Sequence, residues 1–355
     1  MKIKTKRNIR SLSLEDLRLF FTEKKDQAFR GDQVYQWLWK KGIHNFKGMT
    51  NLSKSTRSLL ETNFVINHFD ISHQQKSNDG TIKNVLKLYD NLLIESVLIP
   101  TANRTTACVS SQVGCSLDCK FCATAQIRRM RNLNADEIFD QVVAMDQQSR
   151  LYFDRPLSNI VFMGMGEPLM NYKNMINAID KITQEAGLGM SPSRITVSTS
   201  GIPKMIKKMA DDQVGFGLAI SLHSARQNIR ERLMPFAEKF PLNELVDAIK
   251  YWFQKTAKAV TYEYVVWKGI NDDDDDINSL VDFCKISPCK VNLIEYNPIG
   301  NDQFIQAEKD RIKAYEIALQ DHRITVTLRR SRGKDIDAAC GQLANKSERT
   351  QVVLP

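Results

Sequence analysis

Residues 115–122 read CSLDCKFC, so that three cysteines are separated by three and then by two residues. Thiolates this close together repel one another and bind soft metals, which argues against an inert buried cluster. A structural zinc site uses four protein ligands, whereas an iron–sulfur cube held by three cysteines leaves one iron for an exogenous ligand. The triplet has no evident fourth cysteine beside it, so it predicts a metal site that is completed from outside the protein.

Downstream of about residue 103, short apolar strand patterns alternate with helical patterns. The first helix opens at Asn134 with Glu137 three residues later, a capping pair. The strand patterns cover 106–110, 159–163, 195–199, 217–222, 260–266 and 291–296, and a last one follows at 324–329. The other helical patterns cover 172–186, 242–256, 275–285 and 308–320. Such alternation predicts an α/β fold with a parallel sheet, here a partial (β/α)6 TIM-like barrel.

The first 65 residues predict a small helical accessory domain. Ser13 is placed to cap a helix through Glu15 and Asp16, and further helical patterns cover 30–41 and 53–62. All three predicted helices carry basic residues, and the whole chain has a formal net charge of +9. Two interpretations stay open at this point: a solvated basic surface, or a module that grips RNA. We expect domains at 1–65, 66–100 (a β-rich extension), 101–334 (the barrel) and 335–355 (a C-terminal segment).

Residues 66–100 are rich in strand signals. Asn78, Asp79 and Gly80 form a hairpin turn signal. Glu95 lies inside an apolar run, where burying a carboxylate is costly. Either its side chain points outward from an edge strand, or it is buried with a raised pKa and equipped to act as a general base.

Polar residues follow several predicted strands at the edge where barrel enzymes place their chemistry. GMGEP at 164–168 supplies two glycines, which let backbone approach a ligand, and Glu167, which can accept from an amino group. STSG, SLH and Asn297-Pro298 follow three other strands. Together they predict a pocket for a ligand that is part amino acid and part nucleoside.

Four cysteines lie outside the triplet. Cys108 falls in the first barrel strand, and Cys340 lies near the C-terminus downstream of several arginines, which favour a nucleophilic thiolate. Cys340 is therefore either a nucleophile or an ordinary buried cysteine. Cys284 and Cys289 are interpreted as core residues.

Composition narrows the class of protein. No apolar run reaches about 18 residues, so no transmembrane helix is expected, and the N-terminus lacks the apolar core of a signal peptide. We therefore expect a cytoplasmic protein that does not bind membranes. The acidic run NDDDDD at 271–276 is interpreted as a solvated helix start rather than a metal site.

CSLDCKFC resembles the signature of radical S-adenosylmethionine enzymes, and GMGEP resembles their contact to the methionine amino group. ACVSSQVGCSLDCKFCATAQ, FMGMGEPLMN, VSTSG, SLHSAR and DIDAACGQL together resemble the dual-specificity adenine carbon-2 methyltransferases, over residues 10 to 345. That family modifies 23S ribosomal RNA and tRNA. One departure is the segment Ile127-Arg128-Arg129-Met130, where the family often has a glycine–aromatic pair.

The resemblance implies a role for each matching residue. Cys115, Cys119 and Cys122 would hold a [4Fe–4S] cluster, whose free iron would bind S-adenosylmethionine. Cys340 would carry the methyl group, Cys108 would be its disulfide partner and Glu95 would accept the carbon-2 proton. The cofactor pocket would be lined by Gly166, Glu167, Ser198, Ser221, Leu222, His223 and Asn297.

The implied reaction uses two molecules of S-adenosylmethionine, because the electron-poor carbon-2 cannot attack a methyl sulfonium. One methylates Cys340, and the other yields a 5′-deoxyadenosyl radical that activates the methylcysteine for addition to carbon-2. The implied substrates are an adenosine at the peptidyl transferase centre of 23S rRNA and the adenosine 3′ of the tRNA anticodon. The implied partners include an electron donor such as flavodoxin or ferredoxin, and the enzyme is expected to be a monomer.

Two alternatives remain beside this prediction. A methyltransferase acting on carbon-8 of the same rRNA adenosine, which confers antibiotic resistance, is the nearer one, although the intact GMGEPL and SSQVGC favour carbon-2. A zinc-stabilised RNA-binding protein without catalysis is the more distant one.

Overall fold

A ten-stranded sheet organises the computed structural model, which describes residues 6–300 and 303–344. The strand order is β14-β13-β12-β11-β10-β9-β6-β5-β4-β3. The strands are β3 (Asp70–Lys76), β4 (Ile82–Lys87), β5 (Leu93–Pro100), β6 (Thr105–Cys108), β9 (Asn159–Phe162), β10 (Ile195–Thr199), β11 (Gly217–Ser221), β12 (Val260–Val265), β13 (Cys289–Ile294) and β14 (Thr325–Arg329). Because β3 and β14 are both edges, the described sheet curves without closing.

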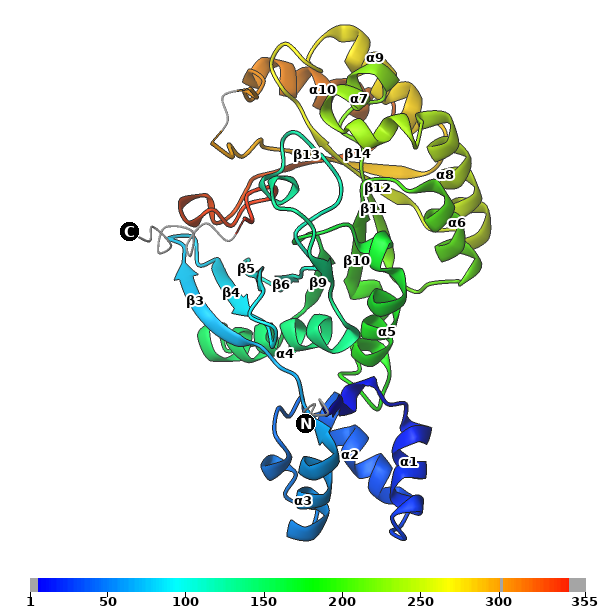
Figure 1. Ribbon diagram of the computed structural model, residues 1–355. Coiled ribbons are helices and arrows are strands. Elements are labelled where there is room, and N and C mark those ends of the chain that lie inside the picture. Colours follow the sequence, from blue (N-terminus) through cyan, green and yellow to red (C-terminus); the bar gives the residue numbers. More distant parts are fainter. Residues whose placement is uncertain (1–5, 301–302, 345–355) are drawn as a thin grey trace.

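The strands from β6 to β14 run parallel, as the alternation of patterns predicts. Helices connect them along the outer side of the curved sheet (Figure 1). These are α4 (Ala135–Phe153), α5 (Tyr172–Thr183), α6 (Pro203–Asp211), α7 (Gln227–Leu233), α8 (Leu242–Thr256), α9 (Asp274–Cys284) and α10 (Lys309–Asp321). The predicted partial barrel is confirmed, and α6 and α7 are helices that the sequence patterns did not include.

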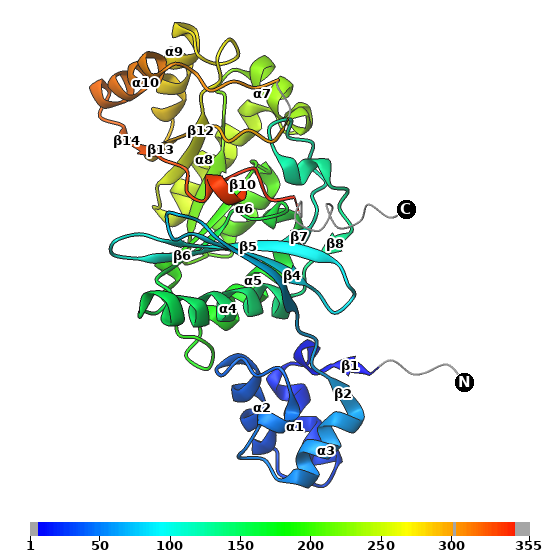
Figure 2. The ribbon, with the colours of Figure 1, turned by 90° about the vertical axis from the view of Figure 1, so that its left-hand side faces the viewer.

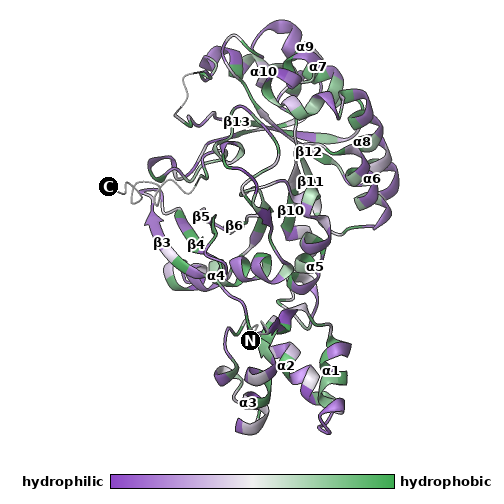
Figure 3. Cartoon of the chain, viewed as in Figure 1, coloured by the Kyte–Doolittle hydropathy of each residue, from purple (hydrophilic) through white to green (hydrophobic). Residues whose placement is uncertain are grey.

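Amphipathic spacing explains why these helices lie on the sheet. In α8, Leu245, Ile249 and Trp252 recur at helical spacing and are fully buried. Figure 3 shows polar residues on the outward side of α6 and α8. Among the described residues, no helix is both long and apolar enough to cross a membrane.

The antiparallel part of the sheet extends it beyond β6. The turn at 78–80 joins β3 to β4, and Gly80 has a φ of +88°, a conformation that glycine adopts without strain. β5 lies between β4 and β6, so it is not an edge strand. Glu95 on β5 is only 1% exposed, and the expectation of an outward-pointing carboxylate is therefore wrong.

The N-terminal helices α1 (Leu14–Glu23), α2 (Phe29–Trp39) and α3 (Lys54–Asn63) pack beneath α4 (Figure 2). Ser13 and Asp16 form the capping box that opens α1. A short parallel pair, β1 (Arg7–Asn8) with β2 (Phe64–Val65), brings the two ends of this unit together. The buried Arg10 forms an ion pair with Asp140 of α4, which fixes the unit against the barrel.

Candidate active site

A cavity of about 170 Å³ opens at the carboxyl ends of the parallel strands. Its walls combine the cysteine loop after β6 with the polar residues that follow β9 to β13. Among its lining residues are Cys115, Cys119, Cys122, Gly166, Glu167, Ser198, Ser221, His223, Asn297 and Cys340. Of the predicted site residues, this cavity therefore gathers all but Leu222, Glu95 and Cys108.

The cysteine loop is anchored at both ends. A two-stranded ribbon, β7 (Gln112–Val113) with β8 (Arg131–Asn132), holds its base. The Ala123 N–H, directly after the last cysteine of the triplet, donates to the Gly341 carbonyl at 2.7 Å, and the Thr124 hydroxyl donates to the Leu343 carbonyl. The loop and the C-terminal segment around Cys340 are thus tied together, although they are far apart in the chain.

The three thiols suit a cluster by their chemistry. Burial raises the pKa of Cys115 to about 11 and also raises the pKa of Cys119, and the neighbouring thiols add to both shifts. Within residues 6–300 and 303–344, no three His, Cys, Asp or Glu side chains converge tightly enough to hold a single metal ion. An iron–sulfur cube spreads its cysteine ligands around a larger body. The fit therefore rests on three soft donors facing one cavity.

Gly166 and Glu167 form the wall after β9. Gly166 has a φ of +95°, and a Cβ there would lie 2.5 Å from Cβ of Gln112, so only glycine fits. The Glu167 carboxylate is 2% exposed and accepts from the Leu169 N–H at 3.0 Å and from the backbone and hydroxyl of Ser200 at 2.8 and 2.7 Å. Burial nevertheless raises the pKa of Glu167. A cationic amino group in the cavity would offset that burial.

His223 forms the wall after β11 in a left-handed conformation, with a φ of +55°. Its Nδ1 accepts from the Val265 N–H at 3.2 Å, and its ring meets Phe121 edge-on with centroids 4.7 Å apart. Burial lowers the pKa of His223 to about 3, so the ring is neutral. Leu222 is fully buried and lies outside the cavity lining, and its N–H donates to the Glu263 carbonyl.

Asn297, in the loop after β13, joins the cavity wall to Cys340. Its Nδ2 donates to the Cys340 carbonyl at 3.2 Å. Its Oδ1 is buried and has no hydrogen-bond donor among the described residues. Because a buried acceptor without a donor is costly, this atom points to a ligand donor.

Cys340 is exposed and lines a second cavity of about 370 Å³, which Cys108 also lines. Burial raises the pKa of Cys108 to about 12, and the nearby Cys340 thiol adds to the shift. Arg329 lines both cavities, and the Cys340 thiol is the main cause of its raised pKa. The two cysteines that the resemblance pairs are therefore neighbours beside one guanidinium.

Glu95 contacts the C-terminal segment and does not line either cavity. Its carboxylate accepts from the Ala344 N–H at 2.7 Å and lies 3.7 Å from the Lys83 ammonium. The predicted C-terminal segment at 335–355 is seen as far as Ala344, and the rest of it lies outside the described residues.

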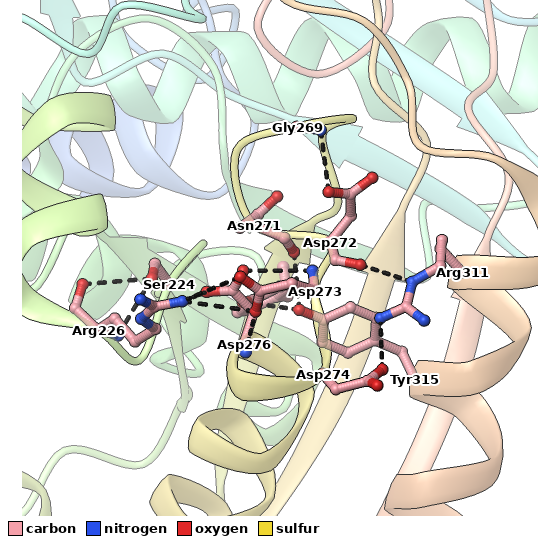
Figure 4. A network of polar contacts seen from close by, with 11 residues as sticks. Ser224, Arg226, Gly269, Asn271, Asp272, Asp273, Asp274, Asp276, Arg311 and Tyr315 are labelled. Atoms are coloured by element: carbon pink, nitrogen blue, oxygen red, sulfur yellow. Dashed lines mark hydrogen bonds and ion pairs between the residues drawn. The ribbon is translucent and has the colours of Figure 1, made fainter.

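The acidic run opens α9, as expected, but it is not simply solvated. Asp273 caps the helix in a capping box with Asp276, and Arg226 pairs with both carboxylates (Figure 4). Asp276 is 1% exposed, and burial raises its pKa to about 6. Arg311 forms an ion pair with Asp274, so arginines from two other helical segments hold the start of α9.

Among the residues that sequence reasoning did not place in the cavity walls are Glu263 on β12 and Arg329 at the end of β14. Glu263 is 4% exposed, accepts from Asn292 Nδ2 at 2.9 Å and lies 3.6 Å from Arg329. The signal was a lone carboxylate within the apolar strand VTYEYV, the same signal that drew attention to Glu95.

Two further cysteines, and the segment at 127–130 that differs from the family pattern, lie outside the walls of the second cavity. Cys284 is buried in the core, whereas Cys289 is partly buried against it and donates from its thiol to the Cys284 carbonyl at 3.4 Å. Arg128, Arg129 and Met130 are exposed beside the cysteine loop.

The fold and the cavity define a radical S-adenosylmethionine enzyme. The sequence family described as the Radical SAM superfamily matches residues 109–281, and that described as the Ribosomal RNA large subunit methyltransferase N-terminal domain matches residues 7–66. A solved radical SAM methyltransferase from Sphaerobacter thermophilus superposes with a TM-score of 0.89 at 36% identity, covering 95% of this chain and 99% of that one.

Curated relatives narrow the class further. A probable dual-specificity RNA methyltransferase RlmN from Flavobacterium johnsoniae is 64% identical over 96% of this chain and 98% of its own. The corresponding Bacillus velezensis protein is 38% identical over 97% and 94%. The chain belongs to the RlmN family of dual-specificity RNA methyltransferases, and it is an RNA-modifying transferase.

Proposed function

We propose that this enzyme methylates carbon-2 of an adenosine in 23S rRNA and of the adenosine 3′ of the anticodon in tRNA, through a methylcysteine at Cys340. The observation that carries the proposal is the position of Cys340. It lines the cavity of the three cluster cysteines, and it also lines the cavity of Cys108. A methyl carrier needs both the methyl donor on one side and a resolving thiol on the other.

In this proposal, Cys115, Cys119 and Cys122 hold a [4Fe–4S] cluster, and the cavity residues hold S-adenosylmethionine. When bound, these two groups supply the one-electron chemistry that activates an unreactive C–H bond. Glu167 faces the cofactor's amino group, and Asn297 offers its unsatisfied oxygen to a cofactor donor. Gly166, Ser198, Ser221 and His223 shape the walls, and Leu222 contributes backbone that positions His223.

The chain's own groups complete the transfer. Cys340 takes the methyl group on its sulfur, beside the Arg329 guanidinium that lines the same two cavities. After the carbon adds to carbon-2, Glu95 accepts the proton, which requires the Ala344 N–H to leave the carboxylate. The Cys108 thiolate then attacks the Cys340 sulfur: the S–S bond forms, the bond from that sulfur to the transferred carbon breaks, and this carbon takes the electron pair and a proton as the methylated RNA is released.

RNA recognition is proposed for the basic N-terminal domain at 1–65, together with the net charge of +9. An electron donor of the flavodoxin or ferredoxin class is proposed to reduce the cluster. The proposed site of action is the cytoplasm, with the enzyme as a monomer.

The test is nucleoside analysis of 23S rRNA and tRNA modified by the anaerobically reconstituted enzyme. The expected product is 2-methyladenosine in both RNAs, with iron rather than zinc in the protein. A product consisting only of 8-methyladenosine would refute the position. A colourless, zinc-loaded protein would refute the chemistry.

A further inference from the structure

The second cavity lies on the other side of Cys340 from the cofactor cavity. Whereas the cofactor cavity uses the carboxyl ends of the strands, this one reaches Asn159, Thr196 and Thr261 at the starts of β9, β10 and β12. The two cavities share Met163, Glu263, Ile294, Arg329 and Cys340. The interior of the open barrel is therefore divided by the residues around the carrier cysteine.

The charge of the second cavity is strongly one-sided. Its described lining carries four arginines and the carboxylate of Glu263. Glu263 lies 3.6 Å from Arg329, so this carboxylate is opposed by a cation already. Arg104, Arg330 and Arg332 are exposed, which opens this basic lining to solvent. A volume of about 370 Å³ falls within the roughly 300–1,000 Å³ of small-molecule pockets.

Cys108 is one half of the disulfide that the proposed function forms, and it lines the second cavity. Its residue is 7% exposed, and it lines the second cavity but not the first. In the proposed function, Cys108 ends each turnover in a disulfide with Cys340, which must be reduced before the next methylation. A folded reductase presents its thiols on a protein surface, whereas the second cavity admits a small molecule to the disulfide.

We propose that the arginine-lined cavity admits a small anionic thiol, one that carries carboxylate or sulfonate groups, to reduce the Cys108–Cys340 disulfide. This inference rests on the proposed function. A first thiolate attacks the exposed Cys340 sulfur, the S–S bond breaks, and the electron pair leaves on Cys108 beside Arg329. A second thiolate then displaces Cys340 from the mixed disulfide. Two thiols become one small disulfide, and both cysteine thiolates regain protons from solvent.

The experiment measures reduction directly. The holoenzyme is brought through one turnover, the Cys108–Cys340 disulfide is verified by peptide mapping, and its loss is followed by alkylation and mass spectrometry. The probes are 2-mercaptoethanesulfonate and neutral 2-mercaptoethanol, each rate normalised to that thiol's reaction with a small disulfide. We expect the sulfonate to react about tenfold faster after normalisation, because a basic cavity concentrates anions. Added salt should reduce this preference.

Charge reversal supplies the matched variants. Arg104→Glu with Arg330→Glu should abolish the preference for the sulfonate while leaving the mercaptoethanol rate nearly unchanged. Lys204→Glu with Lys250→Glu makes the same change in net charge on exposed residues of α6 and α8, and it should keep the preference. The salt titration of the unaltered enzyme tests the same point without any variant.

Three results would overturn the inference. The first is an equal normalised rate for both thiols, and the second is reduction by a protein dithiol alone. The third is an arginine variant that binds RNA less tightly but keeps its thiol preference, which would assign the cavity to RNA phosphates. Absence of the disulfide after turnover would overturn the proposed function as well, so the two failures are distinguishable.

Discussion

Asn297 donates from its Nδ2 to the Cys340 carbonyl at 3.2 Å, while its Oδ1 stays buried without a donor among the described residues. One side chain therefore connects the loop after β13 with the carrier cysteine and leaves an acceptor for a ligand. In the proposed function, cofactor binding and the placement of Cys340 therefore depend on the same residue.

Replacing this side chain should weaken cofactor binding. We expect Asn297→Ala to raise the Kd for S-adenosylmethionine about tenfold, because leaving a buried donor of the cofactor without its acceptor costs about 1–3 kcal/mol. Equilibrium dialysis with the reconstituted enzyme measures this. Asn243→Ala, at an exposed position in α8, is the control and should leave the Kd unchanged. An unchanged Kd in Asn297→Ala would show that Oδ1 does not contact the cofactor.

A methyl group at Gly166 should cost more than one at Gly189. Both residues have positive φ, but nothing lies within 4 Å of a Cβ at Gly189, whereas a Cβ at Gly166 would meet Gln112 at 2.5 Å. Gln112 in turn accepts from the Glu167 N–H at 2.9 Å. We expect Gly166→Ala to lose a further 1–3 kcal/mol or so of stability relative to Gly189→Ala, and to bind S-adenosylmethionine more weakly. Urea unfolding and dialysis check the two effects, and equal losses would contradict the steric argument.

Local sequence signals predicted part of the candidate site and several helix starts. GMGEP identified the wall after β9 because glycines and a carboxylate follow an apolar strand. The starts of α1 and α4 were predicted from capping residues and that of α9 from its acidic run, since those signals are local. α6 also carried a local signal, Pro203 at its first position, and was still missed.

Glu263 and Arg329 were missed for a different reason. They lie 66 residues apart in sequence (329 − 263), and they become wall residues only because β12, β13 and β14 pair side by side. The position of Glu95 likewise depends on Ala344, which lies 249 residues away. Contacts of this range come from the packing of the whole sheet, which no local pattern records.

Alanine variants of Cys340 and Cys108 should lose different steps of the reaction. Cys340→Ala removes the methyl carrier, so neither the protein nor the RNA should be methylated. Cys108→Ala keeps the carrier but removes the resolving thiol, so RNA should remain attached to the protein. Gel analysis after ribonuclease digestion, with mass spectrometry of the Cys340 peptide, separates these outcomes. Normal turnover by Cys108→Ala would assign Cys108 a structural role.

His223 should make the folded protein sensitive to acid. Its folded pKa of about 3 lies below the ordinary value of 6.5, so between these values the unfolded chain binds the extra proton. The contribution of His223 to stability is thus present above pH 6.5 and is lost as the pH falls, by about 2 kcal/mol at pH 5.

The check is the urea midpoint at pH 7 and pH 5. His223→Asn should show a smaller fall than the unaltered protein, since asparagine tolerates the left-handed backbone without titrating. His73→Asn, at an exposed position on β3, is the control and should behave like the unaltered protein. Identical falls in His223→Asn and the control would contradict the buried neutral ring.

The attachment of the N-terminal helices should depend on the Arg10–Asp140 pair. Both side chains are almost fully buried, at 0% and 2% exposure, and Arg10 also donates to the carbonyls of Leu38 and Ile43. Arg10→Met leaves the Asp140 carboxylate buried without this cation, and such a change costs about 3–5 kcal/mol.

Arg150 pairs with Asp146 on the same helix α4, but its side chain is 61% exposed. Arg150→Met should therefore cost about 1 kcal/mol or less. Urea unfolding compares the two variants, and limited proteolysis shows whether the N-terminal helices separate from α4 first. Equal stability losses in the two variants would mean that the buried pair does not hold this interface.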